Sequence, residues 1–239
     1  MASWTETDDK VLDRYHLWQL DLISPFLGRR LLEVGAGPGQ LAALLCRKGE
    51  FQKYVTLEPS DHFYPILKRL EGSCEHLETR KCTIDELEPG LNGTFESVFS
   101  VHVMEHVEDD FAFLKRAYDL LAPGGNIIVL VPALQALYSE LDRKIGHYRR
   151  YDKRMIRDLS RRLGTEIVLN RYDNAVGVLG WWWVCKIRKI DYHTTGNKKT
   201  LLKYFDFFST HVLPFVSRIE KYVQPPIGLN LTAVLRKPS

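Results

Sequence analysis

Two glutamates and a glycine-rich turn are the residues best placed to hold a ligand. Glu33 lies at the end of a short apolar segment and is followed by the turn 35–39, Gly-Ala-Gly-Pro-Gly. Glu58 ends a second apolar segment about twenty residues further on, the distance at which nucleotide-binding folds place an acid that holds ribose hydroxyls. A glycine turn after a buried strand lets a ligand lie against the backbone. The spacing therefore predicts a nucleoside site on a strand–turn–helix unit.

Details of the turn distinguish between nucleotide ligands. A dinucleotide site needs another glycine three positions after Gly37 and free N–H groups at the helix start, but residue 40 is Gln and Pro38 has no N–H. No arginine follows Glu58 to receive a 2′-phosphate. Glu33 would repel a diphosphate but could accept from a cationic amino group. These features predict S-adenosylmethionine as the cofactor, rather than NAD or NADP.

Several further segments resemble the class I S-adenosylmethionine-dependent methyltransferases. The resemblance covers about residues 28–170, and its markers are the turn 33–39, Glu58, the apolar strand 97–101 followed by Met104-Glu105-His106-Val107, and Leu121-Ala122-Pro123-Gly124-Gly125 before the strand 127–131. It implies an α/β fold, a Rossmann-like seven-stranded, mostly parallel sheet with helices on both faces. It also implies methyl transfer to an acceptor, whose identity the markers do not specify.

The resemblance places the cofactor residues at strand ends and in the loops that follow them. An apolar residue against the adenine and a polar group near its amine are expected at 83–85, and an amphipathic helix at 10–23 could bring Tyr15 to the methionine end or only pack on the sheet. The predicted cofactor-binding residues are Tyr15, Glu33, Gly35, Ala36, Gly37, Gly39, Glu58, Pro59, Thr83, Ile84, Asp85, Ser100, Val101 and His102.

The segment 102–106, His-Val-Met-Glu-His, formally matches a zinc-protease signature. That chemistry needs both histidines on one face of a continuous helix, with a third protein ligand. Here a strand runs straight into the motif, and the acidic first turn of a helix comes only afterwards, at 108–110. We therefore expect no metal site, and the resemblance instead places His106 near the reaction centre, with a capping or packing role as the alternative.

A basic and aromatic segment, 142–151, follows the strand that borders the substrate cleft in this type of sheet. His147 could act as a general base, Tyr148 or Tyr151 could orient the nucleophile, and arginines could pair with an anionic group. The predicted catalytic residues are His147, His106, Tyr148 and Tyr151, and the predicted substrate-binding residues are Arg149, Arg150, Trp181 and Trp182. The alternative is a structural corner with solvated cations.

The connection 171–226 is expected to form a helical and aromatic lid before a last strand at 228–235. It contains three consecutive tryptophans, 181–183, within the uncharged run 175–185, and an apolar helix is predicted at 201–216. Eleven apolar residues cannot span a bilayer, although tryptophans beside lysine and arginine also suit an interfacial helix. We favour a lid over peripheral membrane contact, and either implies a bulky or amphiphilic acceptor.

Length and composition predict one domain over residues 1–239. The chain is 45% hydrophobic, enough for one substantial core, with a cofactor-binding core at 28–170 and substrate cap or lid segments at 133–163 and 171–226. A net charge of +3 does not by itself require a nucleic-acid partner. The sequence does not specify an oligomeric state.

The four cysteines (46, 74, 82 and 185) show no paired spacing, so neither a zinc knuckle nor a disulfide framework is predicted. This pattern indicates a reducing compartment. The polar, acidic segment 1–9 does not resemble a signal peptide, so a cytoplasmic location is expected, with peripheral membrane contact as a variant.

The most consistent function is S-adenosylmethionine-dependent methyl transfer to a small-molecule or lipid-like acceptor. An RNA-modifying methyltransferase would use the arginines between 149 and 162, but no base-methylating Asn-Pro-Pro-Tyr loop is present. A non-catalytic S-adenosylmethionine-binding accessory protein would keep only the cofactor residues. Both remain alternatives at this point.

Overall fold

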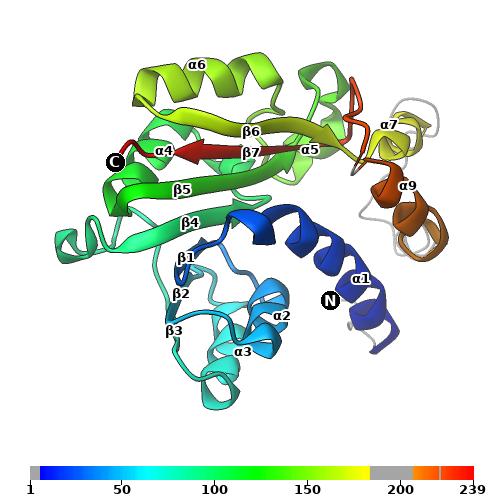
Figure 1. The fold of residues 1–239 in the computed structure, drawn as a ribbon. Helices are drawn as coiled ribbons and strands as arrows, with labels where there is room; N and C mark the ends of the chain where they lie inside the picture. The colour runs from blue at the N-terminus through cyan, green and yellow to red at the C-terminus, as the bar shows by residue number, and fades with distance from the viewer. Residues whose placement is uncertain (1–5, 184–206, 221) are drawn as a thin grey trace.

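A seven-stranded sheet forms the centre of the protein (Figure 1). The computed structural model describes residues 6–183, 207–220 and 222–239, with side chains from residue 14 onward. The strands are β1 (Arg30–Val34), β2 (Lys53–Leu57), β3 (Leu77–Arg80), β4 (Phe95–Val101), β5 (Leu121–Pro132), β6 (Glu166–Asp173) and β7 (Asn230–Arg236). They are ordered β3-β2-β1-β4-β5-β7-β6, and β7 alone runs antiparallel to its neighbours. The predicted fold class is confirmed.

Helices cover both faces of this sheet (Figure 1). They are α1 (Glu6–Ile23), α2 (Gln40–Lys48), α3 (Tyr64–Lys68), α4 (Asp110–Leu120), α5 (Glu140–Lys144), α6 (Lys153–Leu163), α7 (Ala175–Trp182) and α9 (Leu213–Glu220). Leu114 of α4 and Ile156 of α6 belong to one buried cluster, whereas Leu20 of α1 and Leu44 of α2 belong to the other. The apolar stripes of the helices thus bury the two faces of the sheet separately.

The segment 133–141 looks helical in the sequence, but the structure does not form one helix there. Ala133 forms a parallel bridge with Tyr151, and the next residue, Leu134, has a φ of 63°, which a continuous right-handed helix does not allow. A short 3₁₀ turn follows, and α5 begins only after Ser139, whose side chain caps it in a box with Asp142. The chain therefore turns back across the ends of the strands before α6, and this return places the segment 142–151 at the site.

Cys46 and Cys74 form a disulfide. The prediction that no cysteine pair forms is wrong, because the two residues meet through the packing of α2 against the segment before β3 and not through a short spacing in the sequence. The predicted reducing compartment loses its basis. Cys82 is free, and Cys185 lies outside the described residues.

The C-terminal third differs in detail from its predicted outline. β6 continues to Asp173, into the expected insertion, and the last strand is Asn230–Arg236. Of the helix predicted at 201–216, residues 201–206 lie outside the described part, and a π-helical turn (Phe208–Val212) leads into α9. None of the described helices is long and apolar enough to span a membrane. The division into core and lid segments stays a prediction.

Candidate active site

The glycine turn closes over the carboxyl ends of β1 and β2. The backbone N–H groups of Gly35 and Ala36 donate to the carbonyl of Leu57, at 2.8 and 2.9 Å. Gly37 N–H donates to Glu58 Oε2 at 2.7 Å, and Ser60 N–H donates to Glu58 Oε1 at 2.9 Å. The two predicted ligand-binding elements are thus joined directly, and the Glu58 carboxylate is fixed in orientation while each oxygen keeps a further lone pair.

The glycines of the turn serve different purposes. All three have positive φ values, 72° at Gly35, 57° at Gly37 and 92° at Gly39. A Cβ on Gly35 would lie 2.5 Å from Val103 Cγ2, so this position is closed by the loop after β4. A Cβ on Gly37 would meet no atom within 4 Å. The backbone at Gly37 therefore faces open space, as a position approached by a ligand would.

Glu33 is buried beside a tyrosine. Its side chain accepts a hydrogen bond from the Tyr54 hydroxyl, and only 3% of the residue is exposed. Burial is the main reason that the pKa of Glu33 is raised to about 7; the Tyr54 hydrogen bond lowers it and the nearby Glu58 charge adds to the rise, and both effects are included in that value. A cationic amino group would therefore be bound together with loss of a proton from Glu33.

The polar groups of this turn and of the two strand ends fit S-adenosylmethionine. Glu58 offers two oriented oxygens to a pair of hydroxyls, Glu33 offers a carboxylate to an ammonium group, and Gly37 leaves the backbone accessible. Ser100, at the end of β4, has a buried hydroxyl without a partner among the described residues. It is available to a ligand at the same strand ends.

Five other predicted cofactor residues, at 83–85, 15 and 102, differ in exposure and in their contacts. Ile84 is buried, whereas Thr83 and Asp85 are exposed, and Thr83 donates to Glu86 through N–H and hydroxyl. Tyr15 is partly buried, its oxygen accepts from Asn230 Nδ2 at 3.0 Å, and burial raises its pKa to about 12. His102 has a φ of 56°, an unusual conformation for a histidine.

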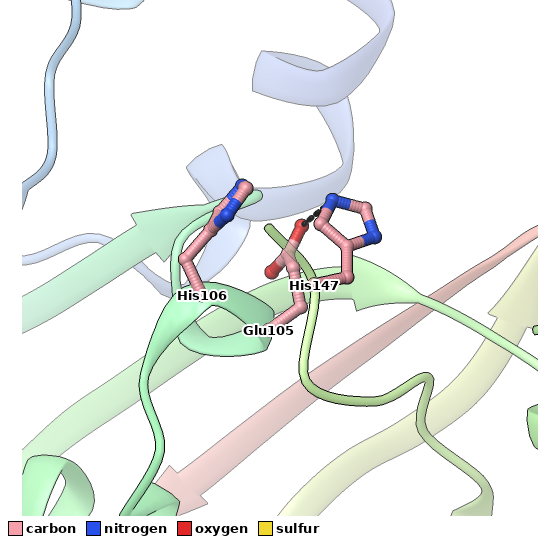
Figure 2. Close-up of side chains that lie close together, drawn as sticks. All are labelled: Glu105, His106 and His147. Carbon is pink, nitrogen blue, oxygen red and sulfur yellow. Dashed lines mark ion pairs between the residues drawn. The ribbon is translucent and has the colours of Figure 1, made fainter. Parts of the chain in front are cut away.

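Beyond β4, three side chains from distant segments converge (Figure 2). Glu105 and His106 belong to a 3₁₀ turn, Met104–His106, and His147 comes from the loop before α6. The two imidazole rings lie with centroids 4.7 Å apart, and His147 Nε2 is 4.0 Å from Glu105 Oε1. Tyr148 N–H donates to the Glu105 carbonyl at 2.8 Å and so holds the two loops together. Partial burial lowers the pKa of His106, although Glu105 acts in the opposite direction.

A buried ion pair holds His147 in place. His147 Nδ1 is 3.1 Å from Asp142 Oδ1, and Arg150 Nε and Nη2 lie 2.9 and 2.7 Å from the same oxygen. Burial alone would raise the pKa of Asp142, but hydrogen bonds from His147, Arg150 and Ser139 bring it down to about 2. Arg150 is only 2% exposed. The Arg150 guanidinium is thus occupied by Asp142 and buried, and its contact with substrate stays a prediction.

Among the neighbouring aromatic and basic residues, some are held by contacts within the protein and one is accessible. The Tyr151 hydroxyl is 3.3 Å from both the Met104 carbonyl and Asp110 Oδ2, and the residue is fully buried. These contacts favour a structural role over the predicted catalytic one. Arg149 pairs with Asp110 at 3.0 Å, whereas Tyr148 is half exposed and remains accessible.

One tryptophan of α7, Trp181, contacts the segment 142–151. The Arg150 guanidinium lies 4.5 Å from the centre of the Trp181 ring, a cation–π contact, whereas Trp182 is 48% exposed. Trp181 thus contacts the side chain that anchors Asp142. Whether the exposed aromatic residues cover an acceptor stays a prediction.

The zinc-protease geometry is absent from this motif. His102 and His106 do not share a continuous helix, because the helical turn there has three residues. The second imidazole beside Glu105 and His106 is instead that of His147. Sequence reasoning missed Glu105, Asp142 and Tyr54 as site residues. The only local signal was the carboxyl group of Glu105 directly after the apolar pair Val103-Met104, and the partners of these three residues come from distant segments.

Comparisons with known proteins agree with this geometry. A family model described as a methyltransferase domain matches residues 10–207, so the chain belongs to that family. The resemblance to class I S-adenosylmethionine-dependent methyltransferases is thereby confirmed, with S-adenosylmethionine as the cofactor of this class.

Among curated relatives, a ubiquinone biosynthesis O-methyltransferase of Xanthomonas oryzae pv. oryzae is 30% identical over 131 residues, covering 53% of this chain and 54% of the relative. The enzyme of the same name from Dinoroseobacter shibae is 34% identical over 106 residues, covering 44% of this chain and 42% of the relative. The chain therefore spans about half the length of the curated relatives it matches.

Solved structures share the fold. A methyltransferase of Haloferax volcanii, determined with the Trm112 methyltransferase activator, aligns with a TM-score of 0.65 at 15% identity, over 98% of this chain and 93% of that one. The 1,6-didemethyltoxoflavin-N1-methyltransferase of Burkholderia thailandensis, determined with S-adenosylhomocysteine, gives 0.59 at 15% identity, over 98% and 80%.

Proposed function

We propose that this chain transfers the methyl group of S-adenosylmethionine to a hydroxyl group of a small-molecule acceptor. The single observation that carries this proposal is the contact between two loops. Val103 packs against Gly35 of the glycine turn and lies two residues before Glu105. The glycine turn and the cluster of Glu105, His106 and His147 are therefore neighbours at the carboxyl ends of adjacent strands, where such sheets bind their ligands.

Within this proposal, Glu33, Gly37 and Glu58 hold the cofactor, with the other predicted cofactor residues around them. The bound cofactor supplies a sulfonium methyl group, whose bond to sulfur breaks as the bond to the acceptor oxygen forms. His106 and His147 are the imidazoles beside this junction of the two loops, and either could take up the hydroxyl proton as the bond to the methyl carbon forms. Tyr148 and Arg149, which contact each other, would border the acceptor, and Trp181, which contacts Arg150, and Trp182 would cover it.

The relatives support a hydroxyl acceptor, because they are named O-methyltransferases. The test is incubation with methyl-labelled S-adenosylmethionine and separate pools of hydroxylated aromatic compounds, hydroxylated lipids and RNA. We expect label in one of the first two pools and its loss in a His147→Ala variant. Label confined to RNA would overturn the proposal in favour of an RNA-modifying enzyme. Cofactor binding without label in any pool would favour an accessory protein.

A further inference from the structure

Glu105 carries a buried carboxylate that has no hydrogen-bond partner in the described part of the chain. The residue is 0% exposed, and neither side-chain oxygen accepts a hydrogen bond within the described part of the chain. The nearest imidazole nitrogen, His102 Nδ1, is 3.4 Å from Oε1 but lacks hydrogen-bond geometry. Burying a carboxylate in this way is unfavourable unless a positive group lies against it. The site therefore calls for a cation at Glu105.

Two imidazoles present nitrogen atoms to the same place (Figure 2). His147 Nδ1 faces the Asp142 carboxylate and His106 Nδ1 faces the Gly146 carbonyl, at 3.1 and 3.3 Å. Carboxylates and carbonyls only accept, so each Nδ1 carries the hydrogen and each Nε2 keeps its lone pair. One ligand atom from each of Glu105, His106 and His147 lies within 4.8 Å of the other two.

We propose that Glu105, His106 and His147 bind a divalent transition-metal ion of the zinc type. Two ligands at about 2.1 Å from a tetrahedral ion lie about 3.4 Å apart. His147 Nε2 and Glu105 Oε1 are 4.0 Å apart and the three ligand atoms lie within 4.8 Å of one another, so side-chain rotations have to bring them closer when the ion binds. Two imidazoles and one carboxylate favour Zn²⁺ over Mg²⁺ or Ca²⁺, which prefer oxygen ligands.

The contacts behind His147 are those expected of a metal ligand. Asp142 accepts from His147 and is itself held by Arg150 and by the N–H and hydroxyl of Ser139, both at 2.8 Å. A carboxylate behind a histidine fixes its tautomer and aims the second nitrogen at the ion. The Ser139 capping box and the return of the chain before α6 thus position a ligand 41 residues after His106 in the sequence.

Three protein ligands leave at least one coordination position for another molecule. Under the proposed function, that position takes the acceptor hydroxyl. The ion would favour release of the hydroxyl proton to solvent, the oxygen electron pair would form the new bond to the methyl carbon, and the electron pair of the old bond would remain on sulfur. This role depends on the proposed function, whereas the binding of the ion does not.

The test is titration of tag-free, EDTA-treated full-length protein with Zn²⁺ by calorimetry and with Co²⁺ by visible absorption. A histidine tag would bind the same ions and has to be removed. We expect one ion per chain and a Co²⁺ spectrum that reports nitrogen ligands. Mg²⁺ in place of Zn²⁺ should give no comparable heat. Absence of Zn²⁺ and Co²⁺ binding, or preferential Mg²⁺ binding, would overturn the proposal.

Variants assign the ion to these residues. His106→Ala, His147→Ala and Glu105→Gln should each weaken Zn²⁺ binding at least about tenfold. His62→Ala is the matched control, because His62 is an exposed histidine that lies outside the cluster and should leave the affinity unchanged. His106 is at the surface, so its variant is expected to fold even where the buried substitutions are not tolerated. Equal affinity in His106→Ala and wild type would contradict the assignment.

Thermal unfolding provides a readout that is independent of methyl transfer. In EDTA, Glu105→Gln should melt at or above the wild-type temperature, because the buried charge is gone. With Zn²⁺, the wild type should gain stability and Glu105→Gln should not. Calorimetry with S-adenosylhomocysteine on the same preparations separates the two proposals, since loss of cofactor binding would contradict the proposed function and leave the metal site standing.

Discussion

At the scale of single residues, the site depends on carboxyl groups held in unfavourable surroundings. Glu33 is buried with a pKa of about 7, and Glu105 is buried without a hydrogen-bond partner among the residues that the structure describes. Asp142, by contrast, has its pKa lowered by His147, Arg150 and Ser139 once the effect of burial is offset. Carboxyl groups with such different surroundings are typical of functional sites, where a bound ligand supplies the partner that a buried carboxyl group lacks.

Glu33→Gln should raise stability and weaken cofactor binding. The Glu33 pKa is raised from 4.5 in the unfolded chain to about 7 in the folded protein. Below pH 4.5 the group is protonated in both states, and above pH 7 it is ionised in both, so the wild type loses up to about 3 kcal/mol as pH rises through this window. Gln keeps an acceptor for the Tyr54 hydroxyl and does not titrate.

Urea unfolding at pH 5 and pH 8 measures this effect. The stability difference between Glu33→Gln and wild type should grow in favour of the variant from the lower to the higher pH, while its affinity for S-adenosylhomocysteine falls. A difference that stays constant with pH would show that Glu33 is not the titrating group.

At the scale of elements, the glycine turn could be predicted from the sequence and the disulfide could not. The turn could be predicted because its glycines, its proline and Glu33 are contiguous, and Glu58 follows at a characteristic distance. The Cys46–Cys74 bond could not, because it depends on how α2 packs near β3. The His147–Glu105 approach was missed for the same reason. It follows from the return of the chain after Leu134 and not from any local spacing.

Gly37→Ala tests the turn. A non-glycine residue at φ 57° costs about 1–2 kcal/mol, a modest loss for the whole protein. The added methyl would project into the open space that we assign to the cofactor, so binding of S-adenosylhomocysteine should fall much more than stability does. Gly49→Ala, at φ 66° and with nothing near its Cβ, is the matched control and should lower stability alone. Equal binding losses in the two variants would contradict the assignment.

Reduction of the disulfide should lower stability without altering cofactor affinity. The bond closes a loop between residues 28 positions apart, for which loop-closure entropy predicts a loss of about 3–4 kcal/mol on reduction. Thermal unfolding with and without dithiothreitol measures this loss. Cys46→Ser should melt at the lower temperature in both conditions, and Cys82→Ala should behave like wild type. A melting temperature unaffected by dithiothreitol would contradict the bond.

At the scale of the whole molecule, the fold class was predictable and the arrangement of its C-terminal part was not. The glycine turn, the apolar segments ending in acids and the other local markers carried the resemblance to class I methyltransferases, and that resemblance implied the seven-stranded, mostly parallel sheet. The insertion of β7 between β5 and β6 is a long-range pairing that no local pattern reports. The same holds for the contact of Trp181 with Arg150, which brings α7 to the site.

The central claim is that two strand-end carboxylates and the glycine turn between them bind an S-adenosyl nucleoside. Calorimetric titration with S-adenosylhomocysteine tests it most directly, with Glu58→Gln as the variant and NAD as the competing ligand. We predict one molecule bound per chain, affinity at least about tenfold weaker in Glu58→Gln, and no heat with NAD. Binding of NAD in preference to S-adenosylhomocysteine, or equal affinity in wild type and Glu58→Gln, would contradict this account.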